Sequence, residues 1–391
     1  MDHTTFRAVC QRARKICKKE WKFASVYAII NNKIKHGVRL FCFLIRRIWR
    51  LNEIEVFVSP NLELINGILL TSRYNELTRP YVGYGLMTEE ENDYTFAVKA
   101  FFKPYREHKI YKVLEAMIPN GFTFSRPVEL ALAFDESGDF SFRFPLSSLC
   151  IAYSGGLERI REFAALLREL ATESGYFDFF QTQAVFYSPY IQKARETVGA
   201  RPFAAMLEAE FGTRQHAYRY VVSALMKGNF GLHFPRREGC ESDLFSVFST
   251  DSLSLSPAIL LHEYAHPFIN PLTEKYRSLV YTHQNAYEWL SKYKLPDYRS
   301  GYDGWEECVN EHLVRAMTIH LLRRCGYTDT AEQMLRNDLY CGYKYIPLLL
   351  ERYCAYDGMR RTHPNFESYY PELLSVFSEP PERASELSAN S

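Results

Sequence analysis

The amino-acid sequence predicts an α+β protein in which a small antiparallel sheet lies beside a helical half. Short β-like runs, separated by turn-forming residues, occupy residues 218–223, 229–234 and 244–248. Helical periodicity dominates before these runs and again after them, up to residue 377. The chain has 391 residues, of which 47% are hydrophobic, so it can bury a sizeable core.

These patterns divide the chain into four parts. Residues 1–50 form a basic N-terminal extension, and residues 51–250 form a mixed α+β region that ends in the sheet. Residues 251–377 form a helical region that contains the residues suited to catalysis. Residues 378–391 are rich in Pro, Ser and Glu, so we expect this tail to be disordered.

The N-terminal extension contains 13 of the 47 Lys and Arg residues but only 2 of the 46 Asp and Glu residues. It is a basic segment in weak contact with a membrane surface, a solvated extension, or the result of a start site placed too far upstream. The second and third interpretations are favoured over membrane contact, since runs of charge are usually solvated. No run reaches the roughly 18 apolar residues of a transmembrane helix. No convincing signal peptide is found either, so the location stays open between cytoplasmic and membrane-associated.

Charge and cysteine content exclude some classes of function. The net charge of +1 gives no reason to expect a nucleic-acid partner. The nine cysteines include no Cys-x-x-Cys pair, and their odd number argues against a complete disulfide framework.

The expected elements follow one another along the chain. A strand-like alternation at residues 55–60 leads into a helical pattern at 62–74. Further helices are expected at 157–172, 181–198 and 202–210, the last ended by Gly212. After the β-like runs, Ser256 and Pro257 mark the start of a new helix as its N-cap and first helical residue.

The helix after Pro257 contains the pattern His-Glu-x-x-His. His262 and His266 are four residues apart, so their imidazoles share one helix face and can bind one zinc ion. Glu263 is placed to accept a proton from a zinc-bound water, whose pKa the metal lowers to about 7. Two unrelated histidines on an ordinary helix are the alternative. Because Pro267 disfavours a helical conformation at His266, we expect the helix to end or kink there.

A hydrolytic zinc site needs a third protein ligand and an open position. The residues after His266 lack the downstream Gly and His of the metzincin pattern, so we expect a carboxylate from a later helix. That helix is marked by a capping pattern of Asp303 and Glu306 and by Gly326 at its end.

Two glutamates are candidates for this third ligand. Glu311 shares a helix face with Cys, Val and Thr residues; alternatively it is exposed and paired with Arg315 at i+4. Glu288 lies closer to His266 in the sequence, but Lys292 at i+4 is typical of an exposed ion pair.

Four stretches resemble a bacterial family known as domain of unknown function 4932. They are VFVSPNLE at 56–63, FFKPYREH at 101–108, HEYAHPFINPL at 262–272 and NEHLVRA at 310–316. The family is taken to comprise gluzincin-like zinc metallopeptidases, and the resemblance covers roughly residues 54–377. It implies a gluzincin-like architecture, with His262, His266 and Glu311 as ligands of one zinc ion and Glu263 as the base. It favours Glu311 over Glu288 and adds export to the locations left open.

The motif and the resemblance together predict a zinc-dependent peptidase that acts on a peptide or protein substrate. In gluzincin-like enzymes the substrate lies as an added strand against a sheet edge. The predicted edge comprises Asn229, Phe230, Gly231 and Leu232, and an ordinary internal strand is an equal alternative. The candidate donors to the oxyanion of the reaction are Tyr343, Tyr345, His312 and Arg315.

Two other classes of function remain open. In the first, zinc joins two helices of a non-catalytic protein whose sheet binds a peptide or a glycan. The presence of Glu263 argues against this class, because a structural zinc site needs ligands but no base. In the second, the protein is a membrane-surface or nucleic-acid adaptor that acts through residues 1–50, which leaves the rest of the chain unexplained.

Overall fold

The computed structural model describes residues 54–236, 241–251, 254–295, 304–378 and 380–382. The chain divides into two units between residues 51 and 52. The first unit lies outside the described residues, with everything predicted for the basic extension, and so does most of the predicted tail. Among the described helices, none is both long and apolar enough to cross a membrane. The second unit has an α+β fold, as predicted.

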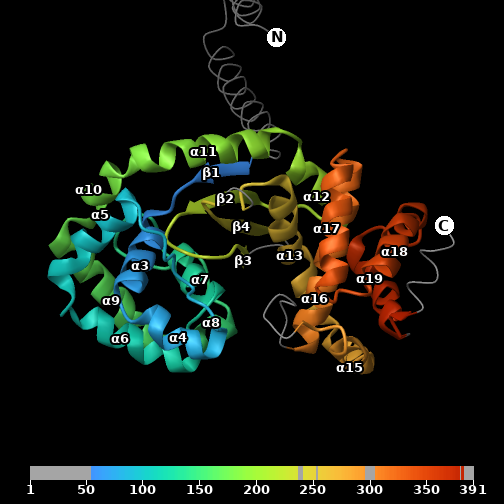
Figure 1. Cartoon of the computed structure of the whole chain (residues 1–391), viewed down its shortest axis with the longest axis horizontal. Coiled ribbons are helices and arrows are strands. Elements are labelled where there is room, and N and C mark those ends of the chain that lie inside the picture. The colour runs from blue at the N-terminus through green and yellow to red at the C-terminus, as the bar shows by residue number, and fades with distance from the viewer. Residues whose placement is uncertain (1–53, 237–240, 252–253, 296–303, 379, 383–391) are drawn as a thin grey trace, which may run out of the picture. The chain divides into compact units, whose positions relative to one another are not determined.

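The described part of the chain contains one mixed sheet, whose strands lie in the order β1-β2-β4-β3 (Figure 1). The strands are β1 (Ile54–Phe57), β2 (Ala217–Ser223), β3 (Phe230–Pro235) and β4 (Ser242–Ser249). β1 pairs with β2 in parallel, as β2 does with β4, while β3 pairs with β4 antiparallel. The expectation of an antiparallel sheet is therefore wrong for every pair except β3 and β4.

The connections between the strands explain these directions. β3 and β4 follow each other closely in the chain, which suits antiparallel pairing. The chain forms a long series of helices between β1 and β2, and such a crossover lets two strands run in the same direction. The alternation within a single strand carries no information about its neighbour, so the sequence pattern could not distinguish these cases.

The helices between β1 and β2 lie mostly on one side of the sheet in Figure 1, but α11 runs beside β1, and α12 packs against α13 and α19 on the other side. They include the helices predicted around residues 157–172, 181–198 and 202–210, and Gly212 ends the last with a left-handed φ of 66°. The elements are α3 (Pro60–Thr71), α4 (Tyr74–Val82), α5 (Asp93–Phe102), η1 (Lys103–Tyr105), α6 (Lys109–Met117), η2 (Ile118–Asn120), α7 (Ser125–Ala133), α8 (Ser148–Tyr153), α9 (Leu157–Ser174), α10 (Tyr176–Thr182), α11 (Ala184–Gly199) and α12 (Phe203–Phe211).

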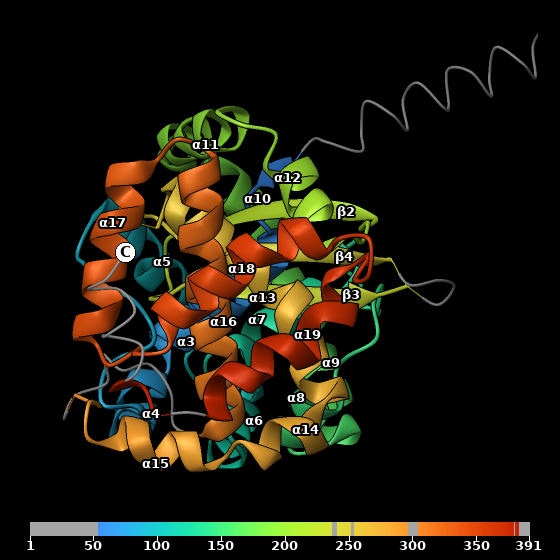
Figure 2. The ribbon, with the colours of Figure 1, turned by 90° about the vertical axis from the view of Figure 1, so that its right-hand side faces the viewer.

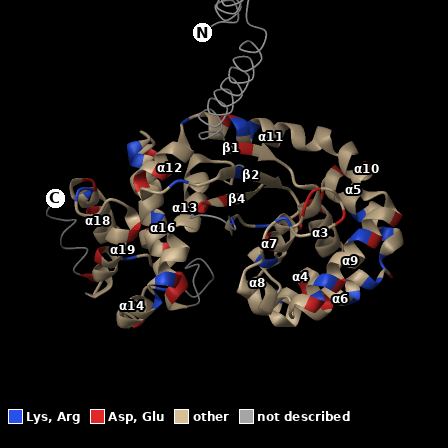
Figure 3. Ribbon diagram, turned by 180° about the vertical axis from the view of Figure 1, so that it is seen from behind, with Lys and Arg blue, Asp and Glu red and all other residues tan. Residues whose placement is uncertain are grey.

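The helices after β4 lie on the other side of the sheet in Figure 1. α13 packs against α16, and α16 also contacts α17 and α18 (Figure 2). Basic and acidic residues are interspersed over the helices of both halves (Figure 3). The elements are α13 (Pro257–Lys275), α14 (Arg277–Thr282), α15 (Asn285–Ser291), α16 (Trp305–Arg324), α17 (Thr328–Tyr340), α18 (Ile346–Met359), α19 (Phe366–Leu374) and η4 (Ser375–Ser378).

Helix α13 begins as predicted but does not end where predicted. The side chain of Ser256 accepts a hydrogen bond from the Ile259 N–H, and Pro257 occupies the first turn. The helix continues through Pro267 to Lys275, so the expected end at His266 is wrong. A proline inside a helix costs roughly 3 kcal/mol. Packing of α13 against β3, β4 and α16 outweighs this cost.

Helix α16 begins at Trp305, and its N-cap residue Gly304 makes no side-chain hydrogen bond. The predicted capping residue Asp303 lies outside the described residues. The helix ends at Arg324, and Gly326 adopts a left-handed φ of 82°, in keeping with the predicted termination.

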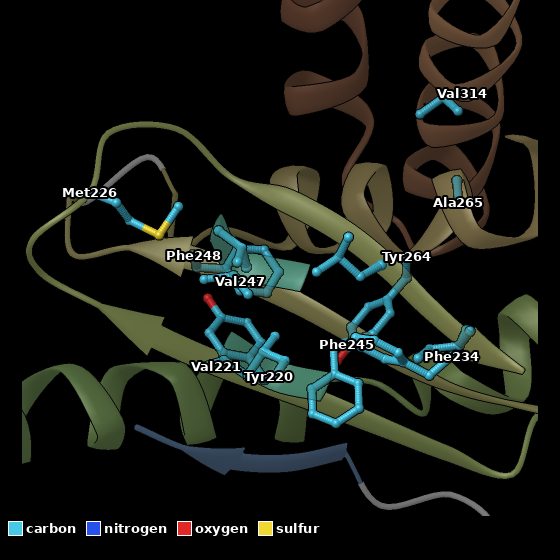
Figure 4. Close-up of a cluster of buried hydrophobic side chains, with 14 of the residues drawn as sticks. Tyr220, Val221, Met226, Phe234, Phe245, Val247, Phe248, Tyr264, Ala265 and Val314 are labelled. Atoms are coloured by element: carbon cyan, nitrogen blue, oxygen red, sulfur yellow. The ribbon is translucent and has the colours of Figure 1, made fainter. Parts of the chain in front are cut away.

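Buried side chains fix α13 on the sheet (Figure 4). Tyr264 of α13 points toward the buried side chains of the strands, whereas Ala265 lies on the side of α13 that faces Val314 of α16. The ring of Tyr264 meets that of Tyr218 edge to face, with the ring centroids 5.5 Å apart. Burial of such aromatic rings contributes strongly to stability. The sheet therefore holds the helix that carries the His-Glu-x-x-His pattern in a fixed place.

Candidate metal centre

Two helices bring three potential ligands together. His262 and His266 lie one turn apart on α13, and Glu311 projects from α16. The Nε2 atoms of the two imidazoles are 3.2 Å apart. The Nε2 atom of His266 is 3.5 Å from Oε1 of Glu311, and that of His262 is 4.0 Å from Oε2. One ligand atom from each residue thus lies within 4.8 Å of the other two.

The competing glutamate lies elsewhere. Glu288 is exposed on α15 and does not belong to this group. Lys292, expected to pair with Glu288, contacts Glu382 instead. Of the two candidates from the sequence, only Glu311 is close to both histidines.

The Nε2 atoms of the two histidines face the same space. The Nδ1 atom of His266 is 3.2 Å from the side-chain oxygen of Asn270. Because an amide oxygen only accepts, Nδ1 of His266 donates this hydrogen bond. Burial lowers the pKa of His262 to about 3, so this imidazole is neutral at neutral pH. The two Nε2 atoms face each other beside the Glu311 carboxylate, and a cation between them would contact all three groups.

Glu311 supplies the negative charge of the group. Its burial acts to raise its pKa, but the charge of Arg315 and its hydrogen bond oppose that effect, and the pKa of Glu311 falls to about 2. Arg315 does pair with Glu311, as one reading of the sequence predicted, with Nε 2.9 Å from Oε2. The pair is not exposed, however, since the Glu311 side chain keeps only 17% of its accessible surface. Two imidazoles and a carboxylate form a typical donor set for catalytic zinc, so the residues fit this ion.

Glu263 lies beside the three ligands and is buried. Burial, with a smaller contribution from Glu311, raises the pKa of Glu263 to about 8, and a hydrogen bond from the Gly231 backbone opposes the rise. A divalent cation nearby would lower this pKa again because it favours the charged form. The pKa of Glu263 therefore depends on whether a metal ion is bound nearby.

Strand β3 is the edge strand next to these residues. It pairs with β4 on one side, and its other side pairs with no strand in the described part of the chain. Gly231 packs directly against the α13 backbone at Glu263, and the side chain of Asn229 caps the end of β4 by accepting a hydrogen bond from the Ser249 N–H at 3.1 Å. Of the two readings of this strand, edge and internal, the structure has the edge.

The chain matches a known family over most of its length. The family model described as Domain of unknown function (DUF4932) matches residues 54–376. The chain belongs to this family. All four stretches that carried the resemblance lie inside the matched residues of this DUF4932 protein. No curated protein and no solved structure matches the chain. Because the family description names no activity, function has to be argued from the geometry.

The four predicted oxyanion donors of the DUF4932 domain lie near one another, and Arg315 connects them to Glu311. The Nδ1 atom of buried His312 is 2.8 Å from the backbone oxygen of Cys308. The rings of Tyr343 and Tyr345 are also buried, with centroids 5.2 and 5.8 Å from that of His312. Their role in the reaction remains a prediction.

Sequence reasoning missed two residues that contact this centre or its neighbours. Asn270 lies four residues after His266, and that helical spacing could have revealed it. Asp338 lies on α17, where its Oδ1 accepts a hydrogen bond of 2.7 Å from Arg315. No signal in the sequence connects Asp338 with Arg315, because the two helices meet only in the folded chain.

A second group of possible ligands among the described residues comprises His108, Glu169 and Glu173. The Nδ1 atom of His108 accepts a hydrogen bond of 3.3 Å from the Ile110 N–H. The proton of neutral His108 is therefore on Nε2, the atom that faces Glu169 at 3.6 Å. That nitrogen has no lone pair to offer, so this group is a poor metal site.

Proposed function

We propose that this protein is a zinc-dependent peptidase. The observation that carries the proposal is the convergence of His262, His266 and Glu311 on one point, with the buried carboxylate of Glu263 beside it. Three protein ligands leave a position open for water or substrate, which is the arrangement of a catalytic zinc site.

Each residue then has a definite task. His262, His266 and Glu311 would hold the ion. When bound, zinc acts as a Lewis acid and lowers the pKa of a coordinated water molecule. Glu263 accepts the proton of the attacking water and passes it to the nitrogen of the leaving amine, as a general base and then a general acid. The burial of Glu263 supports this role, because a dry carboxylate exchanges protons near neutral pH more readily than an exposed one.

The edge strand supports a peptide as the substrate. An extended peptide can add to the free edge of β3 through backbone hydrogen bonds, and its side chains then alternate between the two faces. Gly231 of this strand contacts α13 at Glu263, so a peptide paired there passes the proposed base. This mode needs a repeating amide backbone, which favours a peptide over other hydrolysable substrates.

The alternative is a non-catalytic protein that zinc stabilises and that binds a peptide or a glycan. A structural zinc site is usually closed by four protein ligands. The described residues bring three ligand groups together at this place, and Glu263 has no task in a purely structural site. These observations favour catalysis.

Metal removal and return test the proposal directly. We expect the purified protein to contain one zinc ion per chain and to cleave members of a broad peptide library. Chelation should abolish the cleavage, and added zinc should restore it. A protein that binds zinc stoichiometrically but cleaves no peptide would support the binding alternative, and a protein that binds no zinc would contradict both.

A further inference from the structure

Arg315 lies one helical turn after Glu311 and contacts three groups at once. Its Nε donates to Oε2 of Glu311 at 2.9 Å. Its Nη1 donates to Oδ1 of Asp338 at 2.7 Å. Its guanidinium carbon lies 4.2 Å from the centroid of the Tyr343 ring. The guanidinium thus bridges a carboxylate of α16 and a carboxylate of α17 while it rests on an aromatic ring.

These contacts fix the guanidinium in place. The side chain of Asp338 is only 5% exposed, and Tyr343 is fully buried. An exposed ion pair at i and i+4 gains only about 0.3–0.5 kcal/mol and leaves both side chains free to move. Arg315 differs from such a pair, because its second carboxylate and the ring restrict its rotation. Its planar fork can hold two carboxylates at defined angles, which a lysine cannot do.

The two carboxylate oxygens of Glu311 also have different neighbours. Oε2 accepts the hydrogen bond from Arg315, while Oε1 is the oxygen that lies 3.5 Å from Nε2 of His266. A carboxylate without such a partner can rotate about its terminal bond. With Arg315 on Oε2, Oε1 keeps facing His266.

We propose that Arg315 is a positioning residue for the metal centre, anchored by Asp338 and Tyr343, which orients Glu311 as a ligand through Oε1. The proposal rests on the proposed zinc site. It assigns Arg315 to the orientation of a ligand instead of the oxyanion role considered from the sequence. Partners that orient metal ligands typically change metal affinity by about 10–100-fold when they are removed.

The test is a zinc titration against a competing chelator, with the full-length protein and four variants. Arg315→Met removes the guanidinium, and Arg315→Lys keeps the charge but cannot bridge the two carboxylates. Asp338→Asn weakens the anchor and leaves Arg315 intact. Arg323→Met is the matched control, because Arg323 also lies on α16 and pairs with a carboxylate of α17, that of Glu332, away from the ligands.

We expect Arg315→Met to bind zinc about 10–100-fold more weakly than the parent, and Arg315→Lys to be weakened as well. Asp338→Asn should show a smaller loss in the same direction, and Arg323→Met should bind as the parent does. The visible spectrum of bound Co²⁺ provides a second readout. It should change in the Arg315 and Asp338 variants, because it reports the arrangement of the ligands and not the stability of the fold.

The outcomes distinguish a failure of the positioning role from a failure of the proposed function. Parent-like zinc affinity in Arg315→Met overturns the positioning role and leaves the zinc site intact. Parent-like affinity and Co²⁺ spectrum in Arg315→Lys show that charge alone acts, which also overturns it. If Arg315→Met fails to fold, as judged by circular dichroism, Arg315→Lys and Asp338→Asn decide the question. A parent protein that binds no zinc overturns the proposed function and this inference together.

Discussion

A Cβ atom on Gly231 would overlap the backbone carbonyl oxygen of Glu263. The edge strand and the helix with the candidate base therefore touch through their backbones. Pro267 explains why this carbonyl is available, because proline has no N–H to donate to the carbonyl four residues before it. Only glycine lets β3 approach α13 this closely.

We expect Gly231→Ala to destabilise the protein by about 1–3 kcal/mol, since the added methyl group must push the strand and the helix apart. Denaturant unfolding would measure the loss. Gly358→Ala is the control, because a Cβ at Gly358 of α18 meets no atom within 4 Å. That variant should be as stable as the parent or slightly more stable. An unaffected Gly231→Ala would show that the two backbones separate without cost.

Glu263→Gln should keep the metal and lose hydrolysis. Gln has nearly the shape of a protonated Glu, so the buried site should accept it, but it cannot take a proton from water. We expect cleavage to fall at least about 10²-fold while zinc content stays at one ion per chain. Glu274→Gln, an exposed position on the same helix, serves as the control. Parent-like cleavage by Glu263→Gln would rule out Glu263 as the base.

Zinc binding should distinguish the two candidates for the third ligand. Glu311→Ala removes a carboxylate that lies 3.5 Å from His266, so we expect it to lose zinc in a titration. Glu288→Ala changes an exposed residue of α15 and should retain it. The reverse result would move the metal site away from α16.

A second buried carboxylate predicts a dependence of stability on pH. Glu63 of α3 accepts hydrogen bonds from Ser223 at 2.5 Å, from Tyr94 at 2.7 Å and from Tyr187. Burial raises its pKa above the usual 4.5 in spite of these bonds. Above pH 4.5 the unfolded chain therefore releases the proton before the folded chain does, and stability falls as the pH rises towards the folded-state value.

Glu63→Gln removes this titrating carboxyl group from both the folded and the unfolded chain. Denaturant unfolding of the parent and the variant should therefore show a stability difference that shifts in favour of the variant as the pH rises from 4.5. A difference that stays constant with pH would mean that Glu63 has the same pKa in both states.

The basic extension should be dispensable for the fold and for metal binding. The family match begins at residue 54, and the residues of the proposed site all lie after it. A protein that begins at Leu51 should fold and bind one zinc ion. Loss of binding to anionic vesicles, seen at low salt only, would support a membrane role for residues 1–50. An insoluble or metal-free product would show that the extension belongs to the domain.

Local patterns predicted the elements well and their pairing poorly. The helix start at Ser256 and the termination at Gly212 depend on neighbouring residues, and the structure has both. The direction of β1 and β2 depends on the long helical connection between them, which no strand pattern reveals. Pro267 has a local cost for α13, but the packing that outweighs it involves strands and a helix that are distant in the sequence.

The sequence by itself determined the chemistry that the chain can offer. The spacing of His262, Glu263 and His266 places two imidazoles and a carboxylate on one helix, because helix geometry repeats every 3.6 residues. The fold places Glu311, the glutamate that the resemblance favours, beside both histidines, and it brings Asp338 to Arg315. Those placements depend on the packing of α13, α16 and α17, and contacts between separate helices follow from the shape of the whole core, which no local spacing encodes.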